Sequence, residues 1–328
     1  IKSLPIEGVQ IAQFASRAAT LLEENLEKVR EMLKEEASDL CKPAEDTPLP
    51  PLRAINHRIP LKDESITLPY IPSRCPQAFR EQWEKKRDAY LKTGRWKYET
   101  GPSAVPILFI AKKPGPNGEK RLRTVFAKQR LNDNTIKLSS PLPDIQNILE
   151  TVAQFKYKSL IDGRDAYEQI RVDPKDVQKT LFNTPDGTMV SYVMQQGDTN
   201  AGATYQTLMN HIFASFIGIF MFVYLDDIII FSNTVEDHVK HIRLVLDVLR
   251  KEKLYLSSSD KLQFFARPLV ILGHVIDDKG IKMDPHKVDR ISNWKTPTNA
   301  TLVAGFTGMN RIGTALGPVS YFQRPVFR

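Results

Sequence analysis

The chain has 328 residues, of which 41% are hydrophobic and 26% charged, so it can bury a sizeable core, and we expect two or three globular units. This mixture excludes disorder, collagen-like repeats and low-complexity sequence as the dominant state. Lys and Arg outnumber Asp and Glu by 46 to 38, and residues 78–130 alone hold 14 basic and 5 acidic groups. This excess favours a polyanionic partner, with nucleic acid ahead of a membrane.

The first 52 residues are predicted to form a helical extension followed by a linker. Apolar residues recur at helical spacing between Gln13 and Glu36, which indicates an amphipathic helix. Four prolines in Lys42–Leu52 predict a semi-rigid linker rather than a packed element. The chain begins without Met and without a signal-peptide layout, so we expect it to be a piece of a longer protein.

Residues 53–270 carry alternating helical and strand patterns. A helix is expected over 76–93, and two strands over 104–113 and 121–127 flank the turn PGPNGEK, which together make a basic hairpin. Further elements are expected, in chain order, as a short helix opening at Pro143 and Asp144, a strand over 157–162, a helix over 199–213, a hairpin over 219–231, a helix over 234–251 capped by Thr234, and a strand pair around 269–276.

Two adjacent carboxylates, Asp226 and Asp227, lie between two strongly apolar strands. Burial of like charges is costly, and a divalent cation is the usual compensation, although an ordinary Asp-Asp turn is the alternative. Asp162 ends another predicted strand. Three carboxylates on neighbouring strands could hold two magnesium ions, as an in-line phosphoryl transfer requires.

Several motifs in one order extend this argument. They are Asp162 with Tyr167, Gln196-Gly197-Asp198-Thr199-Asn200-Ala201, Tyr205-Gln206, Tyr224-Leu225-Asp226-Asp227, and Leu272-Gly273-His274. In order and spacing they resemble the motifs of reverse transcriptases, in particular those of Gypsy-like (Metaviridae) long-terminal-repeat retrotransposon polyproteins. The resemblance covers the chain from about Asn56 to Gly308.

The resemblance implies an α+β fold of the right-hand polymerase type. It places a palm of antiparallel sheet and helices, together with fingers, in residues 53–270, and a primer-grip turn with a partial thumb in residues 271–328. The implied activity is that of an RNA-directed DNA polymerase, a nucleotidyltransferase that adds deoxynucleotides to a primer.

The same resemblance gives each candidate residue a role. The metal-binding catalytic residues are Asp162, Asp226 and Asp227; the nucleotide-binding residues are Tyr167, Gln196, Gly197, Lys112, Lys113 and Arg123; and the primer-gripping residues are Leu272, Gly273 and His274. The Tyr167 ring would lie under the incoming sugar and clash with a 2′ hydroxyl, so deoxynucleotides are favoured.

Plainer interpretations stay open for the nucleotide-binding residues. Tyr167 would then be a packed core aromatic, and Gln196 and Gly197 a glycine loop before a helix. The basic residues would form a solvated turn, although the planar fork of Arg123 suits phosphate well.

The implied cofactor is Mg²⁺, with Mn²⁺ as the alternative ion. The implied partners are an RNA or DNA template with its primer and deoxynucleoside triphosphates, and no membrane. Other polyprotein domains are expected but have no motif in this chain, and the expected location is a cytoplasmic virus-like particle, with a nuclear phase left open.

The sequence departs from the family pattern at two places. Ala127 and Gln129 stand where the family has Asp and Arg, which removes an expected ion pair in the fingers. Gln195-Gln196-Gly197-Asp198 follows Met194, where the family has Pro-Phe-Gly-Leu. A catalytically impaired nucleic-acid-binding protein on the same fold is therefore the main alternative, and an RNA-dependent RNA polymerase is the second. His238 and His241, on one predicted helix, are expected to be surface residues.

Overall fold

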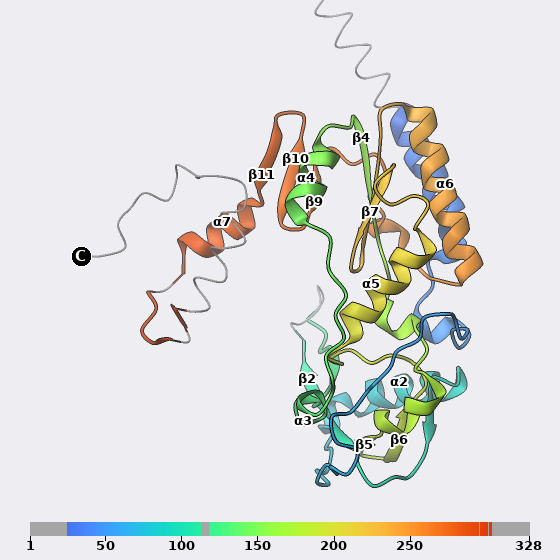
Figure 1. The fold of residues 1–328 in the computed structure, drawn as a ribbon, viewed down its shortest axis with the longest axis vertical. Coiled ribbons are helices and arrows are strands. Elements are labelled where there is room, and N and C mark those ends of the chain that lie inside the picture. The colour runs from blue at the N-terminus through green and yellow to red at the C-terminus, as the bar shows by residue number, and fades with distance from the viewer. Residues whose placement is uncertain (1–24, 113–117, 295, 301, 304–328) are drawn as a thin grey trace, which may run out of the picture.

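The computed structural model of the protein describes residues 25–112, 118–294, 296–300 and 302–303 (Figure 1). The main helices are one over residues 25–36, α2 (Arg80–Lys92), α3 (Gln129–Asp133), α4 (Ile145–Ala153), α5 (Ala201–Ile212), α6 (Val235–Glu252) and α7 (Pro285–Ser292). The strands are β1 (Trp96–Tyr98), β2 (Val105–Ala111), β3 (Leu122–Phe126), β4 (Tyr157–Asp162), β5 (Phe182–Thr184), β6 (Gly187–Ser191), β7 (Met221–Tyr224), β8 (Asp227–Ser232), β9 (Leu269–Ile271), β10 (His274–Asp277) and β11 (Gly280–Met283).

An antiparallel sheet in the order β4-β8-β7 forms the centre of one half of the molecule, and we call it the palm sheet. Its strands have apolar residues at successive positions. Since successive side chains of a strand point to opposite faces, both faces of the sheet are apolar. Ile161, Ile228 and Ile230 enter a core shared with α5, α6 and the helix over 25–36. Ile229 and Phe231 enter a second core with α4, β9 and β10. Helices and a small sheet therefore cover both faces of the palm sheet (Figure 1).

Two helices around the palm sheet begin where the sequence predicts. Thr234 Oγ1 accepts the Asp237 N–H at 3.1 Å and starts α6, and Asp144 accepts the Gln146 N–H at 3.0 Å and starts α4. Such side-chain caps satisfy backbone donors that have no partner in the first helical turn. The predicted caps are confirmed.

A second sheet, in the order β1-β6-β5-β2-β3, belongs to the fingers. The predicted hairpin of β2 and β3 is confirmed, with Ile110 opposite Arg123, but β1, β5 and β6 were not predicted. Aromatic rings fill the core between this sheet and α2, where Trp96 contacts Phe182 edge to face at 5.2 Å between ring centroids.

The expected linker at Lys42–Leu52 is wrong as a description of this segment, because it is packed. Ala44 is buried in the fingers core, and Thr47 is 3% exposed. The buried Arg95 guanidinium donates to the Thr47 carbonyl at 2.8 Å and to its hydroxyl at 2.6 Å. A buried arginine needs such acceptors, and an extended proline-rich backbone leaves its carbonyls free to supply them.

The expected surface position is also wrong for His238, whereas His241 is half-buried. His238 is fully buried on α6, with Nε2 2.7 Å from Ser159 Oγ of β4 and Nδ1 2.9 Å from Ser232 Oγ of β8. His241 is stacked on Phe220 at 4.0 Å. Burial lowers the pKa of His238 to about 3, with a smaller effect from His241, so its ring is neutral. These histidines fasten α6 to the palm sheet.

The C-terminal part comprises the sheet β11-β10-β9 and α7. The strand pair around 269–276 is confirmed, and β11 adds a third strand. Of the predicted primer-grip and thumb segment over 271–328, residues 295, 301 and 304–328 lie outside the described residues, as do Lys113 and the part of the predicted N-terminal helix before residue 25. No helix in the described segments is long and apolar enough to cross a membrane.

Candidate active site

The pairing of β4 with β8 brings the predicted carboxylates to one end of the palm sheet. Asp162 and Asp227 are direct cross-strand partners, and Asp226 lies in the turn between β7 and β8. Directly opposed residues in an antiparallel pair have Cβ atoms about 5 Å apart. The structure therefore brings Asp162 next to the Asp226-Asp227 pair, although 64 residues separate Asp162 from Asp226 in sequence.

The turn that carries Asp226 is tight and is supported from α5. Leu225 has a φ of 50°, in the left-handed region that non-glycine residues rarely adopt. The fully buried Gln206 holds it there, because its Oε1 accepts the Leu225 N–H at 2.8 Å and its Nε2 donates to the Val223 carbonyl at 3.0 Å. Gln206 belongs to a motif that the sequence displays, but the sequence gives it no role.

The electrostatics of Asp226 and Asp227 disfavour their charged forms in the absence of a cation. Burial, then the charges of Asp162 and Asp227, raise the pKa of Asp226 to about 6. Burial and Asp162 also raise the pKa of Asp227. Asp226 Oδ1 is buried and has no hydrogen-bond partner among the residues that the structure describes. An unpartnered, desolvated carboxylate oxygen is what a hard divalent cation would satisfy.

The donor set fits Mg²⁺ or Mn²⁺ in chemistry, since both prefer carboxylate oxygens. Within the described segments, however, no three Asp, Glu, His or Cys side chains converge closely enough to hold one ion together. Asp162 Oδ2 instead accepts the Ser257 hydroxyl at 2.6 Å. The backbone brings the three residues together, whereas joint coordination would require their side chains to turn inward.

Tyr167 lies beside this acidic cluster, on the 3₁₀ turn η4 (Ala166–Gln169) that follows β4. Its half-buried ring meets the buried Tyr205 ring edge to face, with centroids 5.9 Å apart. Burial, and then the charge of Asp226, raise the pKa of the Tyr167 hydroxyl. Tyr167 thus packs against α5 on one side while part of its surface stays accessible.

A polar pocket of about 420 Å³ opens between the fingers hairpin and η4. Three predicted nucleotide-binding residues, Lys112, Arg123 and Gln196, line it together. Gly197 and Tyr167 are not in its wall. Lys113 lies outside the described residues, so the structure does not place it.

Sequence reasoning missed the seven other residues of this pocket, four of which are ionisable. Lys86 and Tyr90 come from α2, and Asp165 and Glu168 come from η4 and the residue before it. The Tyr90 hydroxyl donates to Glu168, and Lys86 Nζ donates to Thr124 Oγ1 at 3.0 Å. Lys86 sits in a run of charged helix residues, and no local signal separates it from its solvated neighbours. Only the fold shows which of them faces the pocket.

The loop that carries Gln196 and Gly197 is fastened to α3. Asn132 Nδ2 donates to the Gly197 carbonyl at 2.8 Å, and Asn132 Oδ1 accepts the Thr199 N–H at 3.0 Å. Gly197 has a φ of 98°, which a residue with a Cβ adopts only with strain. The glycine is therefore required by the backbone.

The predicted primer-grip residues form a two-residue turn between β9 and β10. Leu272 and Gly273 both have positive φ, at 50° and 75°, the pattern of a tight hairpin. The Asp284 N–H donates to the Gly273 carbonyl at 3.1 Å, and His274 is buried, with Nδ1 3.2 Å from the Leu272 carbonyl. The turn is thus braced by the segment that leads into α7.

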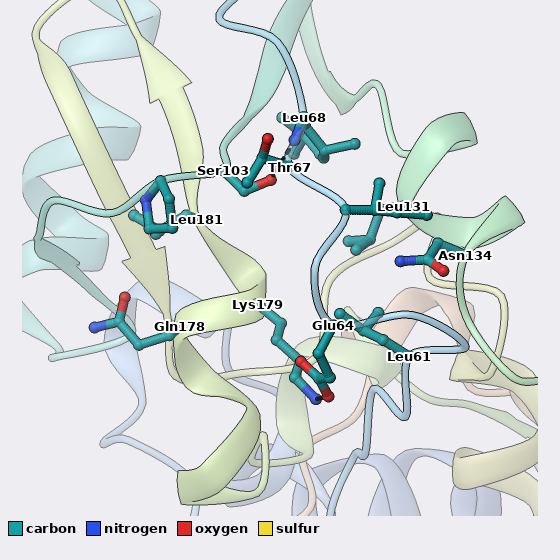
Figure 2. Close-up of a pocket in the computed structure, with 13 residues that line it drawn as sticks. Leu61, Glu64, Thr67, Leu68, Ser103, Leu131, Asn134, Gln178, Lys179 and Leu181 are labelled. Atoms are coloured by element: carbon teal, nitrogen blue, oxygen red, sulfur yellow. Dashed lines mark hydrogen bonds and ion pairs between the residues drawn. The ribbon is translucent and has the colours of Figure 1, made fainter.

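A second pocket in the fingers contains none of the predicted site residues (Figure 2). It has a volume of about 170 Å³ and is lined mostly by apolar side chains, including Leu61, Leu131 and Leu181. An ion pair of 2.8 Å between Lys179 and Glu64 lies along it. Lacking clustered carboxylates or a basic wall, it is a poorer candidate for phosphoryl chemistry than the polar pocket.

Comparison with known proteins agrees with the fold. The family model described as reverse transcriptase (RNA-dependent DNA polymerase) matches residues 110–276, just over half of the chain. The chain therefore belongs to the reverse transcriptase family. Enzymes of this family generally depend on divalent metal ions.

Its relatives are Pol polyproteins of Gypsy-like long-terminal-repeat retrotransposons, as expected. The chain is 36% identical over 234 residues to the retrovirus-related Pol polyprotein from transposon opus of Drosophila melanogaster, a match that covers 71% of this chain and 23% of that protein. It is 27% identical over 331 residues to the transposon Tf2-3 polyprotein of Schizosaccharomyces pombe, covering 93% of this chain and 24% of that protein. The chain thus spans about a quarter of the length of these relatives.

Solved structures confirm the right-hand polymerase fold. The foamy viral protease-reverse transcriptase in complex with double-stranded DNA superposes with a TM-score of 0.71 at 20% identity, over 86% of this chain and 48% of that chain. The same viral protein in complex with an RNA/DNA hybrid gives a TM-score of 0.64 at 19% identity, over 85% of this chain and 39% of that chain.

Proposed function

We propose that the chain is the polymerase core of a retrotransposon Pol polyprotein and acts as an RNA-directed DNA polymerase. It would add deoxynucleoside monophosphates to a primer on an RNA or DNA template. The observation that carries the proposal is the register of the palm sheet, which sets Asp162 opposite Asp227 with Asp226 beside them. The family membership and the basic wall of the polar pocket support it.

Asp162, Asp226 and Asp227 would hold Mg²⁺, with Mn²⁺ as the alternative. When bound, the metal would polarise the primer hydroxyl and neutralise charge on the leaving pyrophosphate. The residues themselves contribute half-buried, partly desolvated oxygen donors at the end of the palm sheet. Their raised pKa values mean that acid competes with the metal for the oxygens of Asp226 and Asp227.

The nucleotide would occupy the polar pocket. Lys112 and Arg123 suit its triphosphate, Lys as a point charge and Arg through a two-pronged contact. The exposed Gln196 amide can contact the nucleotide or template, and Tyr167 would exclude a 2′ hydroxyl from the sugar site. Lys113 stays a prediction of the same kind.

The turn Leu272-Gly273-His274 is proposed to contact the primer. Its positive-φ geometry makes a rigid projection, and the segment leading to α7 braces it. Neighbouring polyprotein domains and a cytoplasmic virus-like particle with an additional nuclear phase stay predictions, which rest on the family membership and on the short share of its relatives that this chain spans.

A catalytically impaired nucleic-acid-binding protein is the second candidate. It is favoured by the side chain of Asp162, one oxygen of which already accepts a hydrogen bond from Ser257. Ala127 and Gln129 in the fingers favour it too. This candidate predicts binding of primer-template without extension.

Primer extension on an RNA template tests the proposal. The unmodified chain is supplied with deoxynucleotides and Mg²⁺ or Mn²⁺ and compared with Asp226→Asn and Asp227→Asn. We expect extension by the unmodified chain and a fall of at least about a hundredfold in both variants, because each lacks an ionised metal ligand.

The control for that experiment is binding of the same primer-template, which the two variants should retain. Binding without extension by the unmodified chain would establish the second candidate instead. Efficient incorporation of ribonucleotides would point to an RNA polymerase and would contradict the proposed role of Tyr167.

A further inference from the structure

A buried cluster of three charged or ionisable side chains lies next to the proposed nucleotide pocket. Lys128 precedes α3, Asp198 precedes α5, and His57 comes from the N-terminal part of the fingers; they are 2%, 9% and 1% exposed. Lys128 Nζ contacts Asp198 Oδ1, and His57 Nε2 lies 3.4 Å from Asp198 Oδ2. The cluster joins segments up to 141 residues apart.

Asp198 is the central member, and it is ionised. Burial opposes its charge, but Lys128 and His57 outweigh that effect and lower the pKa of Asp198 to about 2. Asp198 Oδ2 also accepts the Gln195 N–H at 3.2 Å, and His57 Nδ1 lies 3.2 Å from Thr204 Oγ1 on α5. The carboxylate therefore closes the loop between Gln195 and itself.

That loop presents Gln196 and Gly197, the two residues proposed to contact the nucleotide or template. Gln195 and Asp198 on either side of them are buried, whereas Gln196 and Gly197 are exposed. The conformation of the two exposed residues is thus fixed by two hydrogen bonds, one from the Gln195 N–H to Asp198 and one from Asn132 to the Gly197 carbonyl.

Filling this buried space with charged side chains costs more free energy than filling it with apolar ones. A buried ion pair seldom stabilises a fold more than apolar side chains of the same shape, because both charges lose their hydration. What it supplies is a directional contact between parts of the fingers and the start of α5. A defined geometry at a site can be worth more than net stability, since small displacements of contacting groups cost large factors in rate or affinity.

We propose that Lys128, Asp198 and His57 are positioning residues that hold Gln196 and Gly197 in place for the incoming nucleotide. The proposal rests on the proposed function for the identity of the ligand. Its structural half, the fixing of the loop over residues 195–199 by the cluster, does not depend on catalysis.

The test compares Lys128→Met, Asp198→Asn and the double variant Lys128→Met/Asp198→Leu in the full chain. Asp186→Asn is the matched control, because Asp186 also accepts from Arg87 at 2.8 Å in the fingers but lies in the turn between β5 and β6. Each variant is measured for KM and kcat with deoxynucleotides, for thermal unfolding, and for amide hydrogen exchange in peptides over residues 194–200.

We expect both single variants to raise the nucleotide KM by about tenfold or more with kcat changed less than about threefold, and to speed exchange in the loop. Asp186→Asn should change neither the nucleotide KM nor the hydrogen exchange of the loop. The double variant should regain thermal stability, because neither charge of the Lys128–Asp198 ion pair is left unpaired, but not the low KM, because a leucine side chain cannot accept from the Gln195 N–H.

Recovery of KM together with stability in the double variant would overturn the proposal and leave the cluster with a packing role only. Unchanged exchange in the loop of the single variants would overturn it too. If the unmodified chain does not extend a primer, the proposed function fails. Faster amide hydrogen exchange over residues 194–200 in the single variants, but not in Asp186→Asn, still decides whether the cluster holds the loop in place.

Discussion

The charge of the Asp226 side chain is unfavourable for the stability of the fold but suits the binding of a cation. Its carboxylate is partly buried, faces two other acidic groups, and leaves one oxygen without a partner. A residue placed for stability alone would be hydrogen-bonded or apolar at this position. Groups that bind ions commonly lower the stability of the fold while the ion is absent.

The conflict predicts that Asp226→Asn stabilises the protein in chelator at pH 7. The fold raises the pKa of Asp226 from 3.8 to about 6, so the cost of its charge is fully present above pH 6 and is lost as pH falls through 6 toward 4. Removal of the charge should therefore raise the free energy of unfolding by up to about 2 kcal/mol at pH 7 and by almost nothing at pH 4.

Denaturant unfolding at the two pH values measures the effect. Asp278→Asn is the control, because the Asp278 side chain is 77% exposed and should change stability little at either pH. A loss of stability in Asp226→Asn at pH 7 would show that the carboxylate is better accommodated than its surroundings suggest.

At the scale of elements, the helix over residues 25–36 is part of the palm rather than an appendage. Leu26 and Leu33 enter the core that also contains α5 and α6. Arg243 of α6 donates to both carboxylate oxygens of Glu36, at 2.9 and 2.7 Å, and the Arg30 side chain donates to the carbonyls of residues 264 and 265. The helix braces the back of the sheet that carries the three proposed catalytic carboxylates.

Leu33→Ala should therefore destabilise the whole palm, by about 2–5 kcal/mol, because it leaves a cavity in a core with no solvent access. Met32→Ala is the matched control on the same helix, since Met32 is 38% exposed, and it should change stability by less than about 0.5 kcal/mol. Equal unfolding midpoints for the two variants would mean that the helix is detachable.

At the scale of the whole molecule, the basic excess is concentrated in the fingers, but part of it is used internally. Arg95 and Lys128 are buried, and Arg80 and Arg87 contact Asp186. The charges free to meet phosphate are the exposed ones, such as Lys112, Lys120 and Arg121, near the hairpin of β2 and β3. The number of phosphate contacts should thus be smaller than the number of Lys and Arg residues in the fingers.

Binding of primer-template should weaken as salt rises, because each phosphate contact releases counterions. For Lys120→Ala/Arg121→Ala we expect the slope of log affinity against log salt to become shallower by about 0.7–0.9 for each phosphate that the variant no longer neutralises. Lys240→Ala, on the exposed face of α6 away from the fingers (Figure 1), should keep the slope of the unmodified chain. A slope near zero in the unmodified chain would exclude phosphate contacts as the basis of binding.

Local signals were sufficient for much of the fold and for the hairpin of Asp226 and Asp227, whereas the approach of Asp162 depends on the pairing of β4 with β8. The caps at Thr234 and Asp144 and the apolar strands around Asp226 are readable because they depend on neighbours in sequence. β1 and β5 were missed because each has three residues, too few for a periodic pattern. The burial of the Lys42–Leu52 segment depends on Arg95, and the Lys128 cluster depends on His57 and Asp198, so neither leaves a local trace.

Helix α5 links the two halves of the proposed site along one rigid axis. Its N-terminus continues from the loop that Asp198 closes, and Gln206, six residues beyond Asn200, holds the turn of Asp226. At 1.5 Å per residue, the helix fixes the separation of these two anchor points at about 9 Å along its axis. A sliding of α5 would carry the nucleotide loop and the carboxylate turn by the same amount. Movements of the fingers that pull on Asp198 would therefore reach the carboxylate end of the palm sheet as a translation, with the spacing between the loop and the carboxylate turn preserved.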